Sequence, residues 1–138
     1  METENTHSTV KVDSGWSLRE FQTLNLGDAR IERRLRKVAE DLSRQPSSPI
    51  NQASSDNTAT KAAYRLFQNE KLACDKIIAA HRDQTLARMK GEKVVLCNQD
   101  TTSLNFSTHK ATTGLGPIGD RKSNPQGLFM HSTLAVTP

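Results

Sequence analysis

Hydrophobic residues recur at helical spacing in the first two-thirds of the chain, and the clearest such segment follows Asp28. We predict a long helix with Asp28 as its N-cap, running to about Arg44, where the proline-containing segment 45–49 ends it. On a helical wheel its apolar residues fall on one side, which predicts a face packed into a core. They are Ile31, Leu35, Val38, Ala39 and Leu42.

Two shorter helices are predicted on either side of this long helix. Ser17 and Glu20 have the spacing of a capping box, in which the two side chains bond the first backbone amides of a helix. Apolar residues at helical spacing predict another helix over 59–67, after a loop over 51–57 that is rich in serine and asparagine.

A fourth helix is predicted to begin at Asp75 as N-cap and to end at Gly91. Its apolar side is expected to comprise Ile78, Leu86 and Met89. Together the four helices predict a mainly α domain over 15–91. The polar, aperiodic segment 1–14 is expected to be a disordered N-terminus.

Composition changes at Lys93, where β-like segments replace the helical spacing. The run 94–97 is continuous and apolar, which is typical of a strand buried on both faces, and 128–136 is a second β-like run. The connection between them, 101–127, is rich in glycine, threonine, serine and asparagine and is too long for a hairpin turn. A second domain is therefore expected over 92–138.

Charge and composition narrow the choice of partner and compartment. The chain has 19 lysines and arginines against 15 aspartates and glutamates, a net charge of +4 that permits a polyanionic partner. No apolar run approaches the roughly 18 residues that span a bilayer, so we expect no membrane partner and a cytoplasmic location. Cys74 and Cys97 lack a CxxC spacing, so reduced thiols are expected rather than disulfides or a zinc site.

The placement of cations on the long helix is more informative than their number. Opposite the apolar side lies a basic stripe, interrupted only by Asp41, that spans roughly 20 Å, a length comparable to several phosphate spacings on DNA. The stripe consists of Arg30, Arg33, Arg34, Lys37 and Arg44. It predicts DNA binding. The alternative is a solvated face with i,i+4 pairs such as Glu32 with Arg36.

The helix over 59–67 and the residue after it add further side chains suited to DNA. The group consists of Lys61, Tyr64, Arg65 and Gln68. It combines phosphate contacts with hydrogen bonds to base edges, a mixture typical of a recognition helix. The alternative is an ordinary polar face with Tyr64 packed at the rim of the core. The two helices form one DNA-binding surface only if these faces converge, which depends on tertiary structure.

Asp100 closely follows the strand predicted from the apolar run, after Asn98 and Gln99, and 101–103 are expected to turn the chain after it. A carboxylate at a strand end is rigidly held and could bind Mg²⁺ or Mn²⁺; the alternative is a turn or capping residue that bonds the following amides. Two-metal phosphoryl transfer needs several carboxylates, whereas only Asp120 follows Asp100 in this chain, so no complete catalytic set is predicted. His109 and His131 are interpreted as structural.

Four short motifs occur in order along the chain. They are Leu26–Arg30 (LGDAR), Ala63–Asn69 (AYRLFQN), Asp100–Leu104 (DTTSL) and His131-Ser132. In this order and spacing they resemble the Tn-five-like DDE transposases of bacterial insertion sequences, and the resemblance extends from Trp16 onward. It implies that the helical domain binds double-stranded DNA, the terminal inverted repeat of an insertion sequence. Arg34 and Arg65 match arginines of the family, and Arg30 and Arg44 match its basic positions, whereas Ile31 replaces a residue that can be arginine.

The resemblance also implies that 92–138 is the start of an α/β ribonuclease-H-like domain, with Asp100 as the first carboxylate of the DDE triad. In the intact family this triad holds Mg²⁺ or Mn²⁺ for cut-and-paste DNA transposition. The second Asp and the Glu of the triad would lie beyond Pro138. We therefore expect a truncated transposase that is inactive alone, binds no metal stably, and is associated with the nucleoid.

Two other functions stay open at this point. The chain could be an inhibitor that pairs with full-length transposase, or a non-functional relic whose strands lack partners and invite aggregation.

Overall fold

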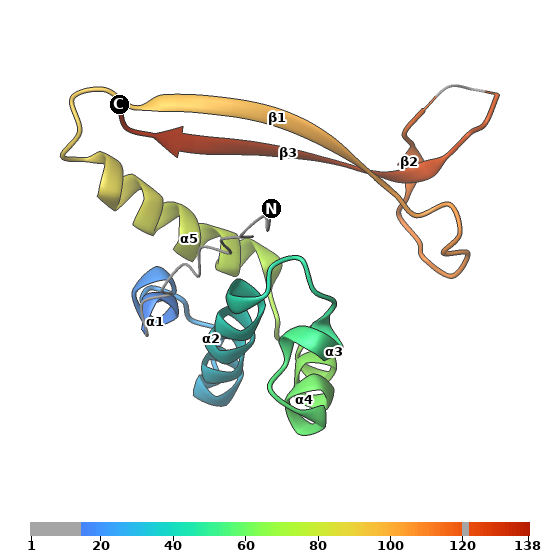
Figure 1. Cartoon of the computed structure of the whole chain (residues 1–138), viewed down its shortest axis with the longest axis horizontal. Coiled ribbons are helices and arrows are strands. Elements are labelled where there is room, and N and C mark those ends of the chain that lie inside the picture. The colour runs from blue at the N-terminus through green and yellow to red at the C-terminus, as the bar shows by residue number, and fades with distance from the viewer. Residues whose placement is uncertain (1–14, 120–121) are drawn as a thin grey trace, which may run out of the picture. The chain divides into compact units, whose positions relative to one another are not determined.

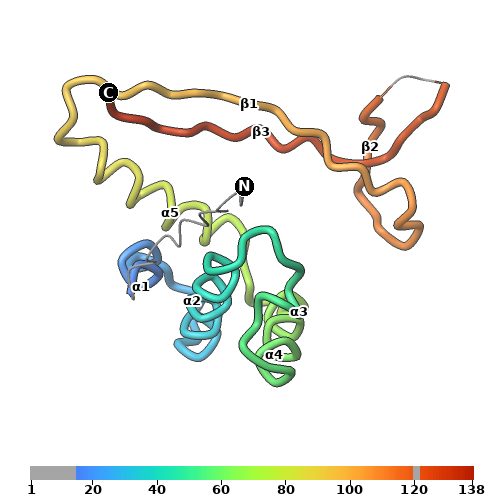
Figure 2. Tube along the Cα trace, in the orientation of Figure 1, coloured from blue at the N-terminus to red at the C-terminus, as the bar shows by residue number. Residues whose placement is uncertain are grey.

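The computed structural model describes residues 15–119 and 122–138 of the chain, which fall into two compact units divided between Arg88 and Met89. The predicted disorder of 1–14 and the side chain of Asp120 lie outside the described residues. The first unit is helical and the second carries a small antiparallel sheet (Figures 1 and 2). The described helices are α1 (Trp16–Glu20), α2 (Ala29–Arg44), α3 (Ile50–Ala53), α4 (Asn57–Phe67) and α5 (Cys74–Met89).

Helix α2 has the bounds and the buried side that its sequence predicts. The Asp28 carboxylate accepts a hydrogen bond from the backbone amide of Arg30 at 3.0 Å, so the predicted N-cap is confirmed. The hydrophobic side of α2 meets residues of the segment between α1 and α2, of α4 and of α5 in one core. Its buried members are Phe21, Leu24, Leu26, Leu35, Val38, Ala63, Leu66 and Ala80, and Ile31, Ala39 and Leu42 pack against them.

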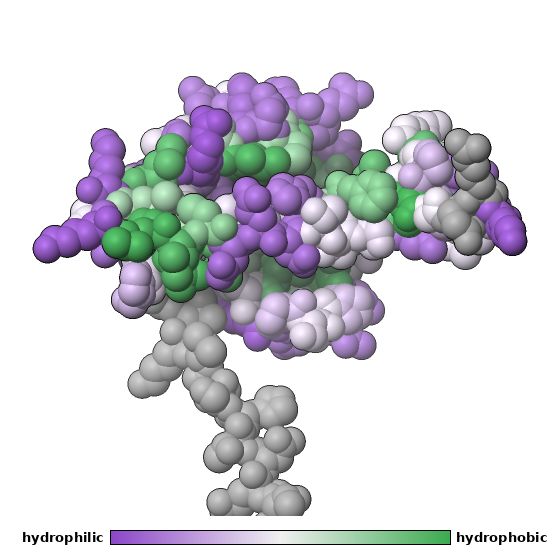
Figure 3. All heavy atoms as spheres, turned by 90° about the horizontal axis from the view of Figure 1, so that it is seen from above, coloured by the Kyte–Doolittle hydropathy of each residue, from purple (hydrophilic) through white to green (hydrophobic). Residues whose placement is uncertain are grey.

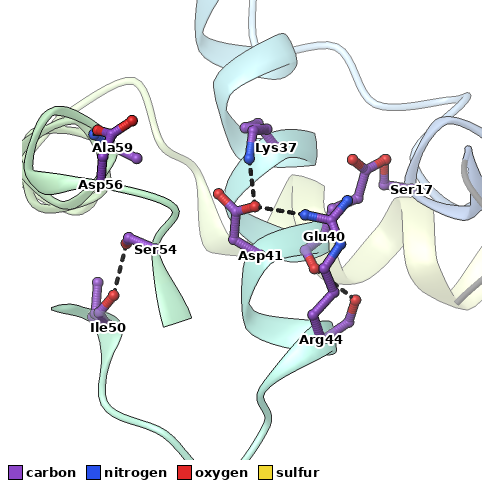
Figure 4. A network of polar contacts seen from close by, with 10 residues as sticks. Ser17, Lys37, Glu40, Asp41, Arg44, Ile50, Ser54, Asp56 and Ala59 are labelled. Carbon is purple, nitrogen blue, oxygen red and sulfur yellow. Dashed lines mark hydrogen bonds and ion pairs between the residues drawn. The ribbon is translucent and has the colours of Figure 1, made fainter. Parts of the chain in front are cut away.

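The predicted capping box at the start of α1 is wrong. Ser17 lies inside the helix, after Gly15 as N-cap, and its hydroxyl donates to Glu40 Oε1 at 2.6 Å. Ser17 is 1% exposed, so its hydroxyl cannot be solvated by water and requires a partner within the protein. The serine therefore joins α1 to α2 (Figure 4) instead of capping its own helix.

The segment expected to be a loop over 51–57 contains the short helix α3. Pro49 precedes it with φ −65°, a torsion that its ring imposes, and the Ser54 hydroxyl donates back to Ile50 O at 2.7 Å. Helix α4 then begins at Asn57, because the Asp56 carboxylate accepts from the amide of Ala59 at 2.8 Å (Figure 4). The prediction of this helix is confirmed, with a start two residues earlier.

Helix α5 forms where predicted but presents a different side to the core. It begins at Cys74, so Asp75 is in its first turn and is not the N-cap. Ile78 and Leu86, expected on the apolar side, are 59% and 49% exposed, whereas Ala80 is 2% exposed within the core. The apolar residues of α5 are spread around its circumference, so a helical wheel identifies no single apolar side. The side that contains Ala80 is the one that joins the core.

Glu20 is the polar link between α1 and α5. Its Oε2 accepts from Arg88 Nη1 at 2.7 Å and its Oε1 accepts from Arg88 Nη2 at 3.2 Å, and Oε1 also contacts His81 Nδ1. The hydrogen bonds from Arg88 lower the pKa of Glu20 below its ordinary 4.5, although burial of the carboxyl acts in the opposite direction.

We expect Glu20→Gln to destabilise the helical unit at neutral pH by about 1 kcal/mol, a modest value because Arg88 and His81 are more than half exposed. A folded pKa below the unfolded one means that the stabilisation is fully present above pH 4.5 and is lost as the pH falls through the lowered pKa. Denaturant unfolding of both forms from pH 7 to pH 3 checks this. The two curves should converge in acid, whereas Glu70→Gln, at an exposed carboxylate, should match the wild type throughout.

The second unit is a three-stranded antiparallel sheet in the order β1-β3-β2. Its strands are β1 (Leu96–Asn105), β2 (Gly116–Pro117) and β3 (Gln126–Val136). The register of β1 and β3 runs from Leu96 opposite Val136 to Asn105 opposite Gly127, which makes a long two-stranded ribbon (Figure 1). The second predicted strand, 128–136, is confirmed within β3.

The first predicted strand is wrong in its bounds and in its burial. Strand β1 starts at Leu96 and continues through 101–103, which were expected to turn the chain, because each of these residues pairs with a residue of β3. Nine of its ten residues are exposed, so the strand is not buried on both faces. The apolar run 94–97 supplied only its first two residues.

The ribbon has one hydrophobic face. Directly opposed residues in an antiparallel pair share a face, and alternate residues along each strand return to it. This face therefore gathers the side chains of Leu96, Leu104, Leu128, Met130, Leu134 and Val136. Most of them are exposed, and Figure 3 shows hydrophobic surface at the end of the ribbon where β1 begins and β3 finishes.

Candidate nucleic-acid interface

The basic residues of α2 and α4 converge on one groove of the helical unit. The two helices are in contact, and two cavities of about 350 and 490 Å³ lie along them. The first is lined by Asp28, Arg30, Ile31, Arg34, Arg65, Leu66, Asn69 and Lys71. The second is lined by Arg30, Arg33, Arg34, Lys37, Val38, Asp41, Ala59 and Ala62. Arg30 and Arg34 line both, so the two cavities are neighbours, and we refer to them together as the basic groove.

Arg34 and Arg65 are two cations of this groove whose guanidinium groups are available, as is that of Arg33 in the second cavity. Arg34 extends from α2 and Arg65 from α4, and both side chains are exposed. Within the part of the chain that the structure describes, neither makes a hydrogen bond or an ion pair. Each guanidinium therefore keeps its full set of N–H donors for an external acceptor, and the planar fork suits a phosphate.

Arg30 is held differently, by the residue that caps its own helix. Its Nη2 lies 3.2 Å from Asp28 Oδ2 and its Nε 3.3 Å from Asp28 Oδ1. The hydrogen bond from the Arg30 side chain is the largest cause that lowers the pKa of Asp28, and the same bond raises the pKa of Arg30. The pair stays ionised at neutral pH. The Asp28 carboxylate holds the Arg30 side chain in place and offsets its positive charge.

Lys37 and Arg44 share one carboxylate, that of Asp41, as Figure 4 shows. Asp41 Oδ1 accepts from Arg44 Nη1 at 3.0 Å and from Lys37 Nζ, and its side chain is only 8% exposed. A nearly buried carboxylate needs such partners. Asp41 thus does not break the basic stripe; it orients two of its cations along α2 and leaves a net positive charge there.

The alternative interpretation of the stripe, a solvated face with a Glu32–Arg36 pair, is wrong about that pair. Glu32 Oε1 accepts from the backbone amide of Leu26 at 2.9 Å, and Arg36 Nη2 donates to the carbonyl of Phe21 at 3.3 Å. Both side chains are directed to the segment between α1 and α2. They hold the segment that precedes α2 in place and do not neutralise the basic stripe.

The other DNA-binding residues predicted on and directly after α4 do not line either cavity. Lys61, Tyr64 and Gln68 are exposed, and about half of the Tyr64 surface, 49%, is open to solvent. Two residues that sequence reasoning missed, Asn69 and Lys71, do line the groove. Both follow the end of α4, where a helical wheel assigns no side. Asn69 ends the motif Ala63–Asn69, whereas Lys71 lies outside every motif.

Asp100 lies in the middle of β1 and not at its end. It is exposed on the hydrophobic face of the ribbon, opposite Ser132. Across the described residues, no three histidine, cysteine, aspartate or glutamate side chains lie close enough together to hold a metal ion. The side chains around Asp100 therefore do not fit a two-metal centre, and no metal-dependent step is assigned to them.

His131 lies on the opposite face of the ribbon from Asp100 and Ser132. Its Nδ1 is 2.7 Å from Thr101 Oγ1, its cross-strand neighbour. A histidine bonded across a strand pair, with the adjacent Ser132 on the other face, is not arranged as a base beside a nucleophile.

Most of the helical unit matches a known protein family. Residues 13–72 match the family model of the transposase DNA-binding region. The matched segment includes α1 to α4 and ends one residue after Lys71. In the described part of the chain, no helix has the length and hydrophobicity needed to cross a membrane.

Proposed function

We propose that the helical unit, whose residues 13–72 match the transposase DNA-binding family model, binds the terminal inverted repeats of an insertion sequence. The proposal places the DNA backbone along the groove between α2 and α4. The exposed side chains of Lys61, Tyr64 and Gln68 on and after α4 are then the candidates for contacts to base edges.

One observation carries this proposal. Arg34 and Arg65, which come from different helices and match arginines of the family, line the same cavity. Two unpaired guanidinium groups in one concave surface are a site for anions, and successive phosphates of a duplex are the anions that a groove of this length can follow. An ordinary solvated surface would have spread these charges or paired them.

The test is a mobility-shift titration of the full chain with duplexes from both ends of the element that carries this coding sequence. We expect specific binding that weakens as salt rises, with a preference over a shuffled duplex of about 10³-fold or more. Equal affinity for the end sequences and the shuffled duplex at low salt would refute recognition of the inverted repeat. It would leave only general DNA binding.

The assignment of the second unit to a ribonuclease-H-like fold stays a prediction. It rests on the motifs Asp100–Leu104 and His131-Ser132, and on the placement of both in one strand pair. In the same way, Asp100 as the first acid of a DDE triad, and Mg²⁺ or Mn²⁺ as its ligand, rest on the resemblance to the family. The hydrophobic face around Asp100 favours a position within a larger protein core over one in solvent.

A further inference from the structure

Lys71, a residue outside every motif, lines the smaller cavity of the groove. We propose that Lys71 binds a backbone phosphate of the DNA in this cavity, together with Arg34 and Arg65. This inference rests on the proposed function, because it assigns a phosphate contact within the same DNA-binding surface.

The chain after α4 holds Lys71 at the cavity by a tight turn. Asn69 Oδ1 accepts from the backbone amide of Lys71 at 2.9 Å, and the amide of Leu72 donates to Asn69 O at 2.9 Å. Leu72 then packs against the hydrophobic core. The hydrogen bond from the Lys71 amide to Asn69 and the packing of Leu72 in the core together hold the backbone of Lys71 beside the cavity.

The charges around this cavity favour an anion. Its lining has four cations, Arg30, Arg34, Arg65 and Lys71, and one carboxylate, Asp28, which leaves a formal excess of three positive charges. Asp28 is already occupied as the N-cap of α2 and as the partner of Arg30. The excess is therefore carried by Arg34, Arg65 and Lys71, which come from three different segments and line one cavity.

A phosphate fits this site better than a base edge does. Every side chain that carries the excess charge is a cation that only donates hydrogen bonds. A phosphate supplies both the acceptor oxygens and the compensating negative charge, whereas a base edge is uncharged. The two arginines offer planar forks, and lysine adds a mobile point charge that can reach a phosphate oxygen from a third side. The cavity, about 350 Å³, is large enough for such a group to enter from the open side.

The test uses the full chain with Lys71→Gln, which removes the charge and keeps most of the aliphatic stem. Lys76→Gln, on the exposed surface of α5 and away from both cavities, is the matched control. We measure binding to an end duplex and to a shuffled duplex between 50 and 200 mM salt. Loss of one phosphate contact should lower the slope of log affinity against log salt by about 0.9, so that salt weakens the variant roughly 3.5-fold less than the wild type.

The reduction should be the same on both duplexes, and Lys71→Arg should restore the slope. The inference is overturned if Lys71→Gln and Lys76→Gln have the same slope, or if Lys71→Gln changes the preference between the duplexes and not the slope. A wild-type chain that binds neither duplex would instead refute the proposed function itself. Thermal melting of the variants, which alter exposed side chains, should match that of the wild type.

Discussion

Replacing Arg34 and Arg65 together by alanine is expected to weaken binding to the proposed inverted-repeat DNA roughly 10²-fold or more. A hydrogen bond between an arginine and a charged group such as a phosphate contributes about 1.5–3 kcal/mol. The two share a cavity, so their combined effect will depart from the sum of the single variants. Equilibrium titrations of the double variant and of both single variants at one low salt concentration measure the loss and its coupling.

The matched control removes the same number of charges elsewhere. Lys76→Ala with Arg82→Ala takes two cations from the exposed surface of α5, and neither residue lines the groove. This control should lose only the small long-range part of the attraction. If both double variants weakened binding equally, the DNA would be responding to net charge, and the groove between α2 and α4 would not be its binding site.

The second large effect is expected from Gly127→Ala at the junction of the three strands. Gly127 is buried and pairs with Asn105 on β1 and with Gly116 on β2. A Cβ there would lie 1.9 Å from the carbonyl oxygen of Leu104 and 2.8 Å from Ile118 Cδ1. Because the first obstacle is backbone, relief requires the strands to separate, at a cost above the roughly 1–3 kcal/mol typical of overpacking.

Amide hydrogen exchange within the full chain measures this effect locally. Protection should be lost in Gly127→Ala at the pairs around residues 104–106, 116–118 and 126–128. Gly116→Ala is the control, because a Cβ at Gly116 meets no atom within 4 Å although the residue is directly opposite Gly127. Equal protection in the two variants would show that the junction can widen without cost.

The helices that the sequence predicted well are those with a local start signal and one clear hydrophobic side. Asp28 caps α2 as expected, because the bond joins residues two apart and depends on nothing distant. The side that contains Leu35 and Val38 is buried, because a strongly amphipathic helix has only one way to exclude its apolar residues from water. The same reasoning failed for α5, whose apolar residues have no common side.

The polar residues were less predictable, because their partners are distant in sequence. Ser17 has a local capping pattern, yet its hydroxyl bonds Glu40, 23 residues away, once α1 packs on α2. Glu20 in turn bonds Arg88, 68 residues away. A buried hydroxyl or carboxylate takes the partner that tertiary packing brings within reach, and no local spacing records that choice.

By itself, the sequence determined the helical character of residues 15–91, the cap and buried side of α2, and the basic stripe opposite that side, since each depends on contacts within one or two helical turns. Only the tertiary structure decided that Arg34 and Arg65 meet in one groove and that Lys71 joins them. It also decided that Asp100 lies within a strand, because pairing with β3 continues past it. Convergence of charges and strand register are set by packing between distant segments, which the order of residues along one segment does not encode.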